Sequence, residues 1–409
     1  MTNPSIPSFP GSLPARRASP LMVCVAVLSL AVLNAGCNDD TTKPGLETTC
    51  SDDPGTICTW AGTGVPGYDG GGRGLLESHF YWPEDLTFSA SGSAFILDWN
   101  NHLVREVVNG KLVTRIGTSV VGDGPEPGSA YTDLIAPGAP GTEISLNHPT
   151  EILPLSDGKM LLLAWHNHKL RRYDPATGLV LVVCGRGAGF AGDGGPAADA
   201  LLNQPQQGAL DGQGNLYILD QRNQRIRKID SNDIITTVAG TGVAGFGGDG
   251  GDPLQAQFDF PAGGNPPPAG AVVCDGENRL YISDANNHRI RRIDFNANTI
   301  ETVAGDGNAA YGGDGGLAVN ASLNNPRDLE FGPDGRLYIA DDFNHRVRAV
   351  DLTTGMITTV AGNGEAKFAG DGGLAVDASL NRPWGLTFDD QGRLYIVDTY
   401  NHRIRRVNL

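Results

Sequence analysis

One unit recurs six times between Ile57 and Leu409, and this repetition limits the possible folds more than any other feature of the sequence. Its clearest mark is an aspartate, two variable positions and then Asn-His, as in Asp284-Ala-Asn-Asn-His288. The final positions of successive copies are 66, 56, 64, 57 and 57 residues apart. A period of this length indicates a propeller or a solenoid, in which each unit packs against its neighbours.

Each copy contains four short runs of alternating apolar and β-branched residues that end at Gly, Asn or Asp. In the last complete copy these runs are residues 358–362, 384–388, 393–398 and 402–407. The 57 glycines and 26 prolines suit many tight turns rather than long helices. The sequence therefore predicts an all-β fold, a six-bladed β-propeller with four antiparallel strands in each blade.

The two ends of the repeat array are complementary. The final copy stops at Leu409 after its third strand, whereas the first run, Thr56–Gly62, aligns with the outermost strand of the other copies. An unpaired edge strand invites aggregation, so a propeller is expected to close. We expect Ile57–Ala61 to pair with Arg403–Val407 and to complete the sixth blade.

The repeated segments resemble a known family. "GRLYIADDFNHRVRAVD" and "GRLYIVDTYNHRIRRVN" are similar to NHL repeats, and the spacer "TVAGxG…GDGG…ASLNxP" resembles that of bacterial exported NHL proteins. The resemblance covers the repeats and implies the six-bladed propeller. It implies no single function, because propellers carry many functions on one architecture.

The N-terminus has the features of an export signal. Arg16 and Arg17 precede an apolar run of 13 residues, Leu21–Leu33, which is too short to span a membrane. The following Leu-Asn-Ala-Gly-Cys37 resembles a bacterial lipoprotein processing site, although Asn34 stands where an apolar residue is usual. We expect a signal peptide at 1–36, lipid on Cys37, a polar tether at 37–55 and the propeller at 56–409. Secretion without lipid is the alternative.

The other cysteines fall into two groups. Cys50 and Cys58 flank a Pro-Gly turn, and in an exported protein this pair predicts a disulfide. Cys184 and Cys274 lie within strand-like runs and are expected to be buried core thiols.

The charge of the chain excludes one class of partner. Loss of residues 1–36 removes two arginines and leaves 28 basic residues against 46 acidic ones. A chain this acidic is unsuited to neutralising nucleic-acid phosphates or to adhering to anionic lipid. We expect no nucleic-acid partner, and membrane contact only through the N-terminal lipid, in a bacterial cell envelope.

The connections between strands sort into two faces. In an antiparallel blade the fourth-to-first and second-to-third connections lie on the same face, which we call the long-loop face. About eleven extra residues precede Pro149, and "GGNPPPAG" follows Pro261. Insertions on one face of a repeat array often mark the binding side.

Two recurrent motifs have a structural interpretation. We expect the Asn-His turns to fasten strands, with Asn in the left-handed region. Two copies have drifted: Ala164 replaces the aspartate in one and Gln224 replaces the histidine in another. The "GDGG" segments supply one carboxylate each, too few for calcium, so their aspartates are expected to cap the short helical piece that follows.

The start of each innermost strand carries the candidate metal ligands. The second residue after each blade's proline is Asp85, Glu151, Gln207, either Gly263 or Ala271, Asp328 and Gly385 in blades one to six. The carboxylates Asp85, Glu151 and Asp328 point at a common axis, and oxygen ligands favour calcium. The alternative is that they are solvated channel acids, one of them neutralised by Arg327.

Aromatic residues gather at long-loop-face positions, where they suit protein or sugar partners. The alternative is that they pack over the seams between blades. The set is Trp82, Trp99, Trp165, Phe343, Trp384 and Tyr400.

Two function classes remain open. The first is a non-enzymatic scaffold, with no certain cofactor, that binds a protein or glycan on the long-loop face. The second is a metal-dependent enzyme with its site at the channel mouth. The six-bladed propellers that this chain resembles include calcium-dependent lactonases and an NHL-type lyase of hydroxyglycine peptides. The lyase's set of axial histidines has no counterpart at the inner-strand positions, where His148 alone lies near the mouth.

Overall fold

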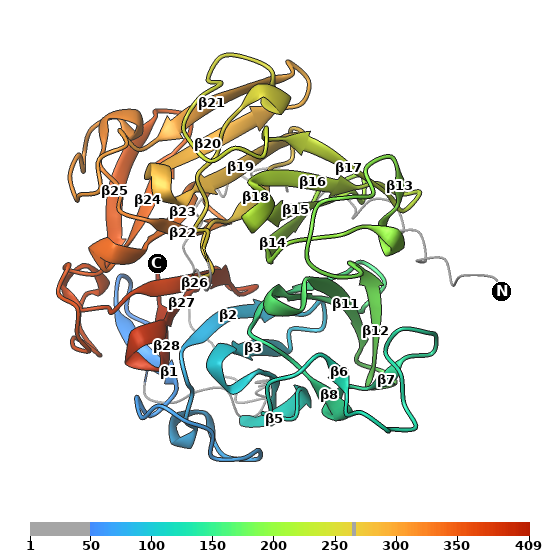
Figure 1. Cartoon of the computed structure of the whole chain (residues 1–409). Coiled ribbons are helices and arrows are strands. Elements are labelled where there is room, and N and C mark those ends of the chain that lie inside the picture. The colour runs from blue at the N-terminus through green and yellow to red at the C-terminus, as the bar shows by residue number, and fades with distance from the viewer. Residues whose placement is uncertain (1–49, 264–266) are drawn as a thin grey trace, which may run out of the picture.

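Six antiparallel sheets stand around a central axis, as Figure 1 shows. The computed structural model describes residues 50–263 and 267–409. Each sheet is one blade, and neighbouring innermost strands contact one another around the ring. The predicted all-β, six-bladed propeller with four antiparallel strands per blade is confirmed.

The blades are numbered along the chain, and each is given from its innermost to its outermost strand. Blade one is β2 (Pro83–Phe88), β3 (Ala94–Asp98), β4 (Leu103–Val108) and β5 (Lys111–Ile116); blade two is β9 (Pro149–Pro154), β10 (Met160–Ala164), β11 (Lys169–Asp174) and β12 (Leu179–Cys184); blade three is β14 (Pro205–Leu210), β15 (Leu216–Asp220), β16 (Arg225–Ile229) and β17 (Ile234–Ala239). Blade four is β18 (Val272–Cys274), β19 (Arg279–Asp284), β20 (Arg289–Asp294) and β21 (Thr299–Ala304); blade five is β22 (Pro326–Phe331), β23 (Leu337–Asp341), β24 (Arg346–Asp351) and β25 (Met356–Ala361); blade six is β26 (Pro383–Phe388), β27 (Leu394–Asp398), β28 (Arg403–Val407) and β1 (Ile57–Ala61).

The loops contain short strands and single turns of 3₁₀ helix. The short strands are β6 (Gly124–Pro125), β7 (Ala139–Pro140), β8 (Ile144–Ser145) and β13 (Gly195–Pro196). Strands β7 and β13 extend blades two and three by pairing with β12 and β17, and β6 pairs with β8. The turns between second and third strands are η2 (Trp99–Asn101), η4 (Trp165–Asn167), η6 (Gln221–Asn223), η8 (Ala285–Asn287), η10 (Asp342–Asn344) and η12 (Thr399–Asn401). The turns in the long loops are η1 (Leu75–Glu77), η3 (Gly141–Glu143), η5 (Ala197–Asp199), η7 (Pro253–Gln255), η9 (Ala318–Asn320) and η11 (Ala375–Asp377).

The ring closes between the two ends of the repeat array. Strand β1 pairs antiparallel with β28, with Ile57 opposite Val407 and Ala61 opposite Ile404. The expected closure is therefore present. A disulfide joins Cys50 to Cys58 at the start of this strand.

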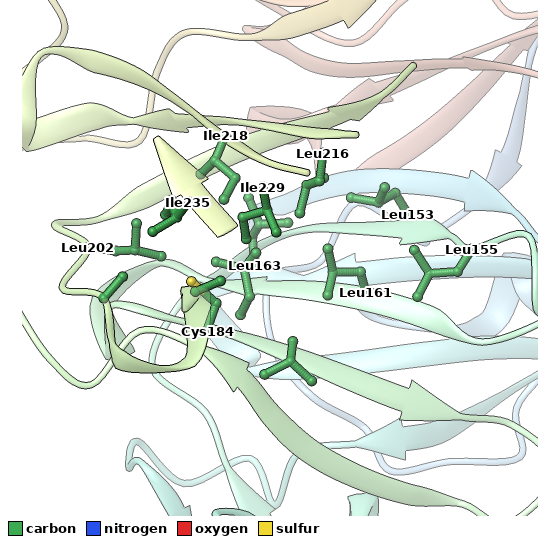
Figure 2. Packing of buried hydrophobic residues seen from close by; sticks show 14 residues of the cluster. Leu153, Leu155, Leu161, Leu163, Cys184, Leu202, Leu216, Ile218, Ile229 and Ile235 are labelled. Carbon is green, nitrogen blue, oxygen red and sulfur yellow. The ribbon is translucent and has the colours of Figure 1, made fainter. Parts of the chain in front are cut away.

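The hydrophobic core is divided among the seams between blades. Between blades two and three, for example, Leu161 and Leu163 pack against Leu216, Ile218 and Ile229 (Figure 2). Because each seam needs both of its blades, no blade can bury its apolar face alone. Cys184 is buried in this seam, as expected, whereas Cys274 is only partly buried.

Three expectations fall wholly or partly on residues that the structure does not describe. The signal peptide at 1–36 and the lipid on Cys37 lie outside the described residues, as does the tether up to residue 49. In the part of the chain that the structure describes, no helix combines the length and the apolar character that crossing a membrane requires.

Candidate site at the mouth of the channel

The innermost strands begin at the long-loop face, and their first residues surround the mouth of the central channel. A pocket of about 230 Å³ lies there. Its lining is predominantly polar and comes from five blades: Glu84, Asp85, Thr150, Gln206, Gln207, Arg327, Asp328, Trp384 and Gly385.

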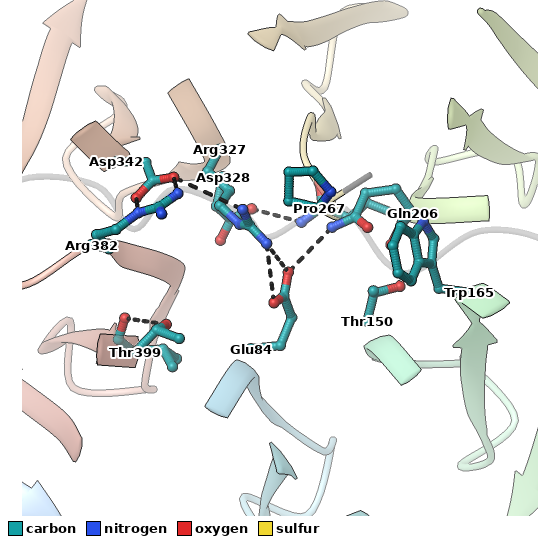
Figure 3. Close-up of polar contacts among 12 residues, drawn as sticks. Glu84, Thr150, Trp165, Gln206, Pro267, Arg327, Asp328, Asp342, Arg382 and Thr399 are labelled. Carbon is teal, nitrogen blue, oxygen red and sulfur yellow. Dashed lines mark hydrogen bonds and ion pairs between the residues drawn. The ribbon is translucent and has the colours of Figure 1, made fainter. Parts of the chain in front are cut away.

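A charged network crosses this mouth from three alternate blades. The guanidinium of Arg327 donates to both oxygens of Glu84, at 3.2 and 3.3 Å, and the Gln206 amide donates to Glu84 Oε1 at 3.3 Å (Figure 3). Glu84 is 4% exposed and Arg327 is 2% exposed. Burial raises the pKa of Glu84 to about 7, against the opposing effect of Arg327. Residues far apart in the sequence thus form one buried network.

Arg327 is also held by aromatic and acidic neighbours. Its guanidinium lies 3.4 Å from the centre of the Trp384 ring and 3.8 Å from Asp342. Asp342 also accepts two hydrogen bonds of 2.8 Å from Arg382. The mouth therefore binds two guanidinium groups of the chain itself between carboxylates and aromatic rings.

The carboxylates predicted from the sequence form the next layer, and each bonds to the following blade. Asp85 accepts from the Ile152 amide, Glu151 from the Gly208 amide, and Asp328 from the Leu386 amide at 2.7 Å. These amides lie on the inner edge of the sheets, where no further strand pairs with them. Each carboxylate therefore accepts a hydrogen bond from a backbone N–H that would otherwise be unpaired.

The remaining members of this layer follow the same rule. Gln207 Oε1 accepts from the Val272 amide, which aligns Ala271, and not Gly263, with Asp85. Ala271 offers no acceptor to blade five, and there Asp328 accepts from the amide of Leu329 in its own strand. The layer is a set of links between blades as well as a set of acids.

These acids also interact with one another. Burial and the charge of Asp328 raise the pKa of Asp85 to about 8, and burial and Asp85 raise the pKa of Glu151. Glu330, two residues beyond Asp328, belongs to the same group, and its pKa is raised to about 8. Glu330 is not among the residues predicted from the sequence, although its position two residues along the same strand was a usable signal.

The geometry does not support the calcium site expected from Asp85, Glu151 and Asp328. Within residues 50–263 and 267–409, no three or more His, Cys, Asp or Glu side chains are grouped so that they could hold a metal ion. Each of the three carboxylates accepts a hydrogen bond from a backbone amide of the neighbouring blade, which would compete with a metal ion for its oxygens.

Aromatic side chains form a continuous array beside the mouth, across blades six, one and two. Trp82 stacks on Tyr400 with ring centres 5.2 Å apart, and Tyr400 meets Trp384 at 5.6 Å. Trp99 lies 6.0 Å from Trp384 and 6.4 Å from Trp165. We call these five residues the aromatic array.

The exposure of the predicted aromatic residues differs from one residue to the next. Trp165 is fully buried, and Trp99 and Trp384 are almost so, which agrees with packing over blade seams. Trp82 and Tyr400 are partly exposed, and Phe343, which stacks on Arg382, is 44% exposed. The indole nitrogens of Trp99 and Trp384 are buried without a hydrogen-bond partner among the described residues.

The Asn-His turns fasten one blade to the next. His102 Nδ1 accepts from the backbone amide of His148, and His402 Nδ1 accepts from that of Trp82. His168, His288 and His345 do the same for Gln204, Asn325 and Arg382. In the drifted copy Gln224 Oε1 takes this role toward Phe260.

The local geometry of these turns corrects one expectation. The histidine, not the asparagine, lies in the left-handed region, with φ of 58° at His102. The residue that each histidine fastens, such as Trp82, also has positive φ in five blades. The fastener therefore holds an unusual backbone conformation at a position whose side chain varies from blade to blade.

The aspartates of the "GDGG" segments hold buried arginines and cap no helix. Six arginines, each three residues after the turn histidine or its replacement, are completely buried: Arg105, Arg171, Arg227, Arg291, Arg348 and Arg405. Asp193, for example, accepts from Arg227 at 2.7 Å, whereas η5 has no side-chain cap. The predicted helix caps are wrong, because these carboxylates are needed as counterions of the arginines.

Family models match most of the repeat array. The model described as "NHL repeat" matches residues 380–407, and the model described as "Teneurin NHL domain" matches residues 184–257 and 271–369.

Two relatives share parts of this sequence. NHL repeat-containing protein 2 of Gallus gallus is 24% identical over 339 residues, which make up 64% of this chain and 46% of that protein. Teneurin-1 of Mus musculus is 31% identical over 236 residues, which make up 53% of this chain and 8% of that protein. The chain therefore spans less than half the length of these relatives.

Solved structures share the fold at low identity. An auxiliary nutrient binding protein from Bacteroides thetaiotaomicron superposes with a TM-score of 0.60 and 16% identity, over 86% of this chain and 75% of that one. A protein of unknown function from the same species gives a TM-score of 0.62 and 17% identity, over 86% of this chain and 74% of that one.

Proposed function

This chain is an NHL-repeat six-bladed β-propeller, and from that premise we propose that it is a scaffold whose long-loop face binds a protein or a glycan. The observation that supports this most is the aromatic array, which joins partly exposed Trp82 and Tyr400 to the polar channel mouth. Aromatic rings with polar groups beside them suit both kinds of ligand.

The variation among blades supports the same face. The fastened positions carry Trp82, His148, Gln204, Phe260, Asn325 and Arg382, while the fasteners themselves barely change. Gln204 and Phe260 are buried, whereas the other four side chains are partly exposed. A uniform frame that presents four different side chains provides a surface that can be specific. One neighbour in fold is named an auxiliary nutrient binding protein, which is in keeping with a binding role.

We further propose that the scaffold works outside the cytoplasm. The basic start, the short apolar run and Cys37 support export and attachment by lipid, with secretion as the alternative.

The test is a binding screen with matched variants. Wild-type protein is applied to a glycan array and to a peptide array, and hits are measured by calorimetry. Trp82→Ala combined with Tyr400→Ala should weaken binding at least about tenfold, because both rings lose their contacts. The control is Phe190→Ala with Phe246→Ala, which removes two exposed rings from blades three and four. Equal affinity of both double variants and the wild type would overturn the proposal.

A further inference from the structure

The layer beneath the Glu84–Arg327 network contains more carboxyl groups than the mouth has basic groups to pair with them. Asp85, Glu151, Asp328 and Glu330 lie close enough to perturb one another electrostatically. Arg327 is the one basic residue in the pocket lining, and its guanidinium is already shared between Glu84 and Asp342. Like charges in a poorly solvated channel disfavour one another, so a positive group placed among them would be stabilised.

A buried acceptor without a partner lies in the same pocket. Gln206 is 4% exposed, and its amide donates to Glu84. Its Oε1 atom receives no hydrogen bond from any part of the chain that the structure describes. An unsatisfied buried acceptor destabilises the protein, so a ligand that donates a hydrogen bond there removes that cost. A donor with a positive charge fits both observations.

The chain itself indicates which cations this face accepts. Arg327 lies against the Trp384 ring with a carboxylate at its edge, and Arg382 stacks on Phe343 while it pairs with Asp342. An alkylammonium or guanidinium head in this setting is favoured by both the ring quadrupole and the carboxylates.

Size and net charge favour a side chain of a protein over a larger molecule. The pocket volume of about 230 Å³ includes space that is open to solvent, so the pocket does not enclose a small-molecule ligand. Its closed part has room for about one water-sized group, which is the size of the ammonium head of a lysine. The net charge of −16 attracts basic proteins over a distance.

We propose that the channel mouth receives the side chain of a lysine of a basic protein partner, whose ammonium head lies among Asp85, Asp328 and Gln206. This inference rests on the proposed function, because it identifies the kind of partner that the long-loop face binds.

The experiment compares two probes that differ in charge. Nα-acetyl-lysine methylamide carries the ammonium group, and its Nε-acetylated form does not. Calorimetry should show at least about tenfold tighter binding of the charged probe. Its affinity should increase between pH 6 and pH 8, because the ammonium group stays charged while the channel acids lose their protons.

Three variants locate the site. Asp85→Asn and Glu330→Gln should each weaken the charged probe about tenfold, and Asp85→Asn keeps an oxygen for the Ile152 amide. Glu143→Gln removes an exposed acid elsewhere and should change nothing. Equal affinity of the two probes would overturn the inference, as would charged-probe binding that neither acid variant weakens.

A parallel arm separates this inference from the proposed function. Binding of glucosamine without binding of the lysine probe would replace the protein side chain with an amino sugar and overturn the inference. Array hits that need Trp82 and Tyr400 but show no preference for basic peptides would retain the scaffold and overturn only this inference.

Discussion

At the scale of single residues, the turn histidines hold the ring together by bonding across seams. Each presents Nδ1 to a backbone amide of the following blade, and Gln224 substitutes for one of them with its amide oxygen. The fold requires a hydrogen-bond acceptor at this position, and the acceptor does not have to belong to an imidazole. Histidine and glutamine can replace each other here because both reach the backbone amide at the equivalent position of the following blade.

We predict that His288→Gln leaves stability within about 0.5 kcal/mol, whereas His288→Ala lowers it by about 1–2 kcal/mol. The alanine variant leaves the Asn325 amide without its acceptor. Gln224→Ala should cost as much, since the Phe260 amide loses its bond. Urea unfolding measures all three variants. Equal losses for His288→Gln and His288→Ala would mean that the bond contributes nothing.

The same histidine should make stability depend on pH. Burial lowers the pKa of His288, so it is neutral in the folded state when the unfolded chain is already protonated. Its contribution is therefore complete above the unfolded pKa of about 6.5 and decreases as pH falls through the lower folded pKa. His288→Gln should lose less stability than wild type between pH 6.5 and pH 5. A parallel decline of both would contradict this assignment.

The sequence predicted part of the mouth and missed the rest for a physical reason. Asp85, Glu151 and Asp328 could be placed together because they share one register in the repeat. The contact of Glu84 with Arg327 and Gln206 depends on how far three blades reach across the axis. The spacing of residues within one repeat gives no information about this distance between blades.

At the scale of the elements, blade two shows how a lost residue is compensated. Ala164 stands where the other turns have aspartate, so Arg171 lacks that counterion. Asp133, from the insertion before Pro149, is buried and accepts from Arg171 Nε at 3.1 Å. Asn167 Oδ1 accepts from the Asn147 amide, a bond that the aspartate makes in other blades. Part of the insertion is therefore structural.

Asp133→Ala should destabilise the protein by about 1–3 kcal/mol, because buried Arg171 keeps only Asp123 as an acidic partner. Adding Ala164→Asp should recover most of the loss by restoring the turn carboxylate. Thermal unfolding of the single and double variants measures both effects. Failure of Ala164→Asp to improve the Asp133→Ala variant would show that the two acids do not replace each other.

The closing strand β1 supplies one quarter of blade six. It buries Ile57, Trp60 and Ala61. Deletion of Thr56–Gly62 should cost more than about 5 kcal/mol, since loss of one buried tryptophan side chain alone costs about 3–5 kcal/mol. Deletion of Asn38–Lys43, in the tether, is the matched control and should leave the melting temperature unchanged. Equal melting temperatures for the two deletions would contradict the role of β1.

At the scale of the whole molecule, the proposed lipid on Cys37 would hold the propeller at a membrane surface. We predict that Cys37→Ser moves the protein from the membrane fraction to the soluble fraction of a bacterial host, because the acylated cysteine is absent. Mass spectrometry of the mature N-terminus is the second readout. A wild-type protein that is soluble and does not begin at Cys37 would rule out the anchor.

The central claim, that the ligand binds the long-loop face over blades six, one and two, is tested most directly by hydrogen–deuterium exchange with and without an array hit. The account predicts slower exchange in the turns 99–102, 165–168 and 399–402 and in the segments before the innermost strands, 79–83, 147–149 and 382–385. The turns 89–93, 155–159 and 389–393 belong to the same blades but lie on the opposite face, and their exchange should not change. Protection confined to those opposite turns, or to blades three to five, would contradict the account.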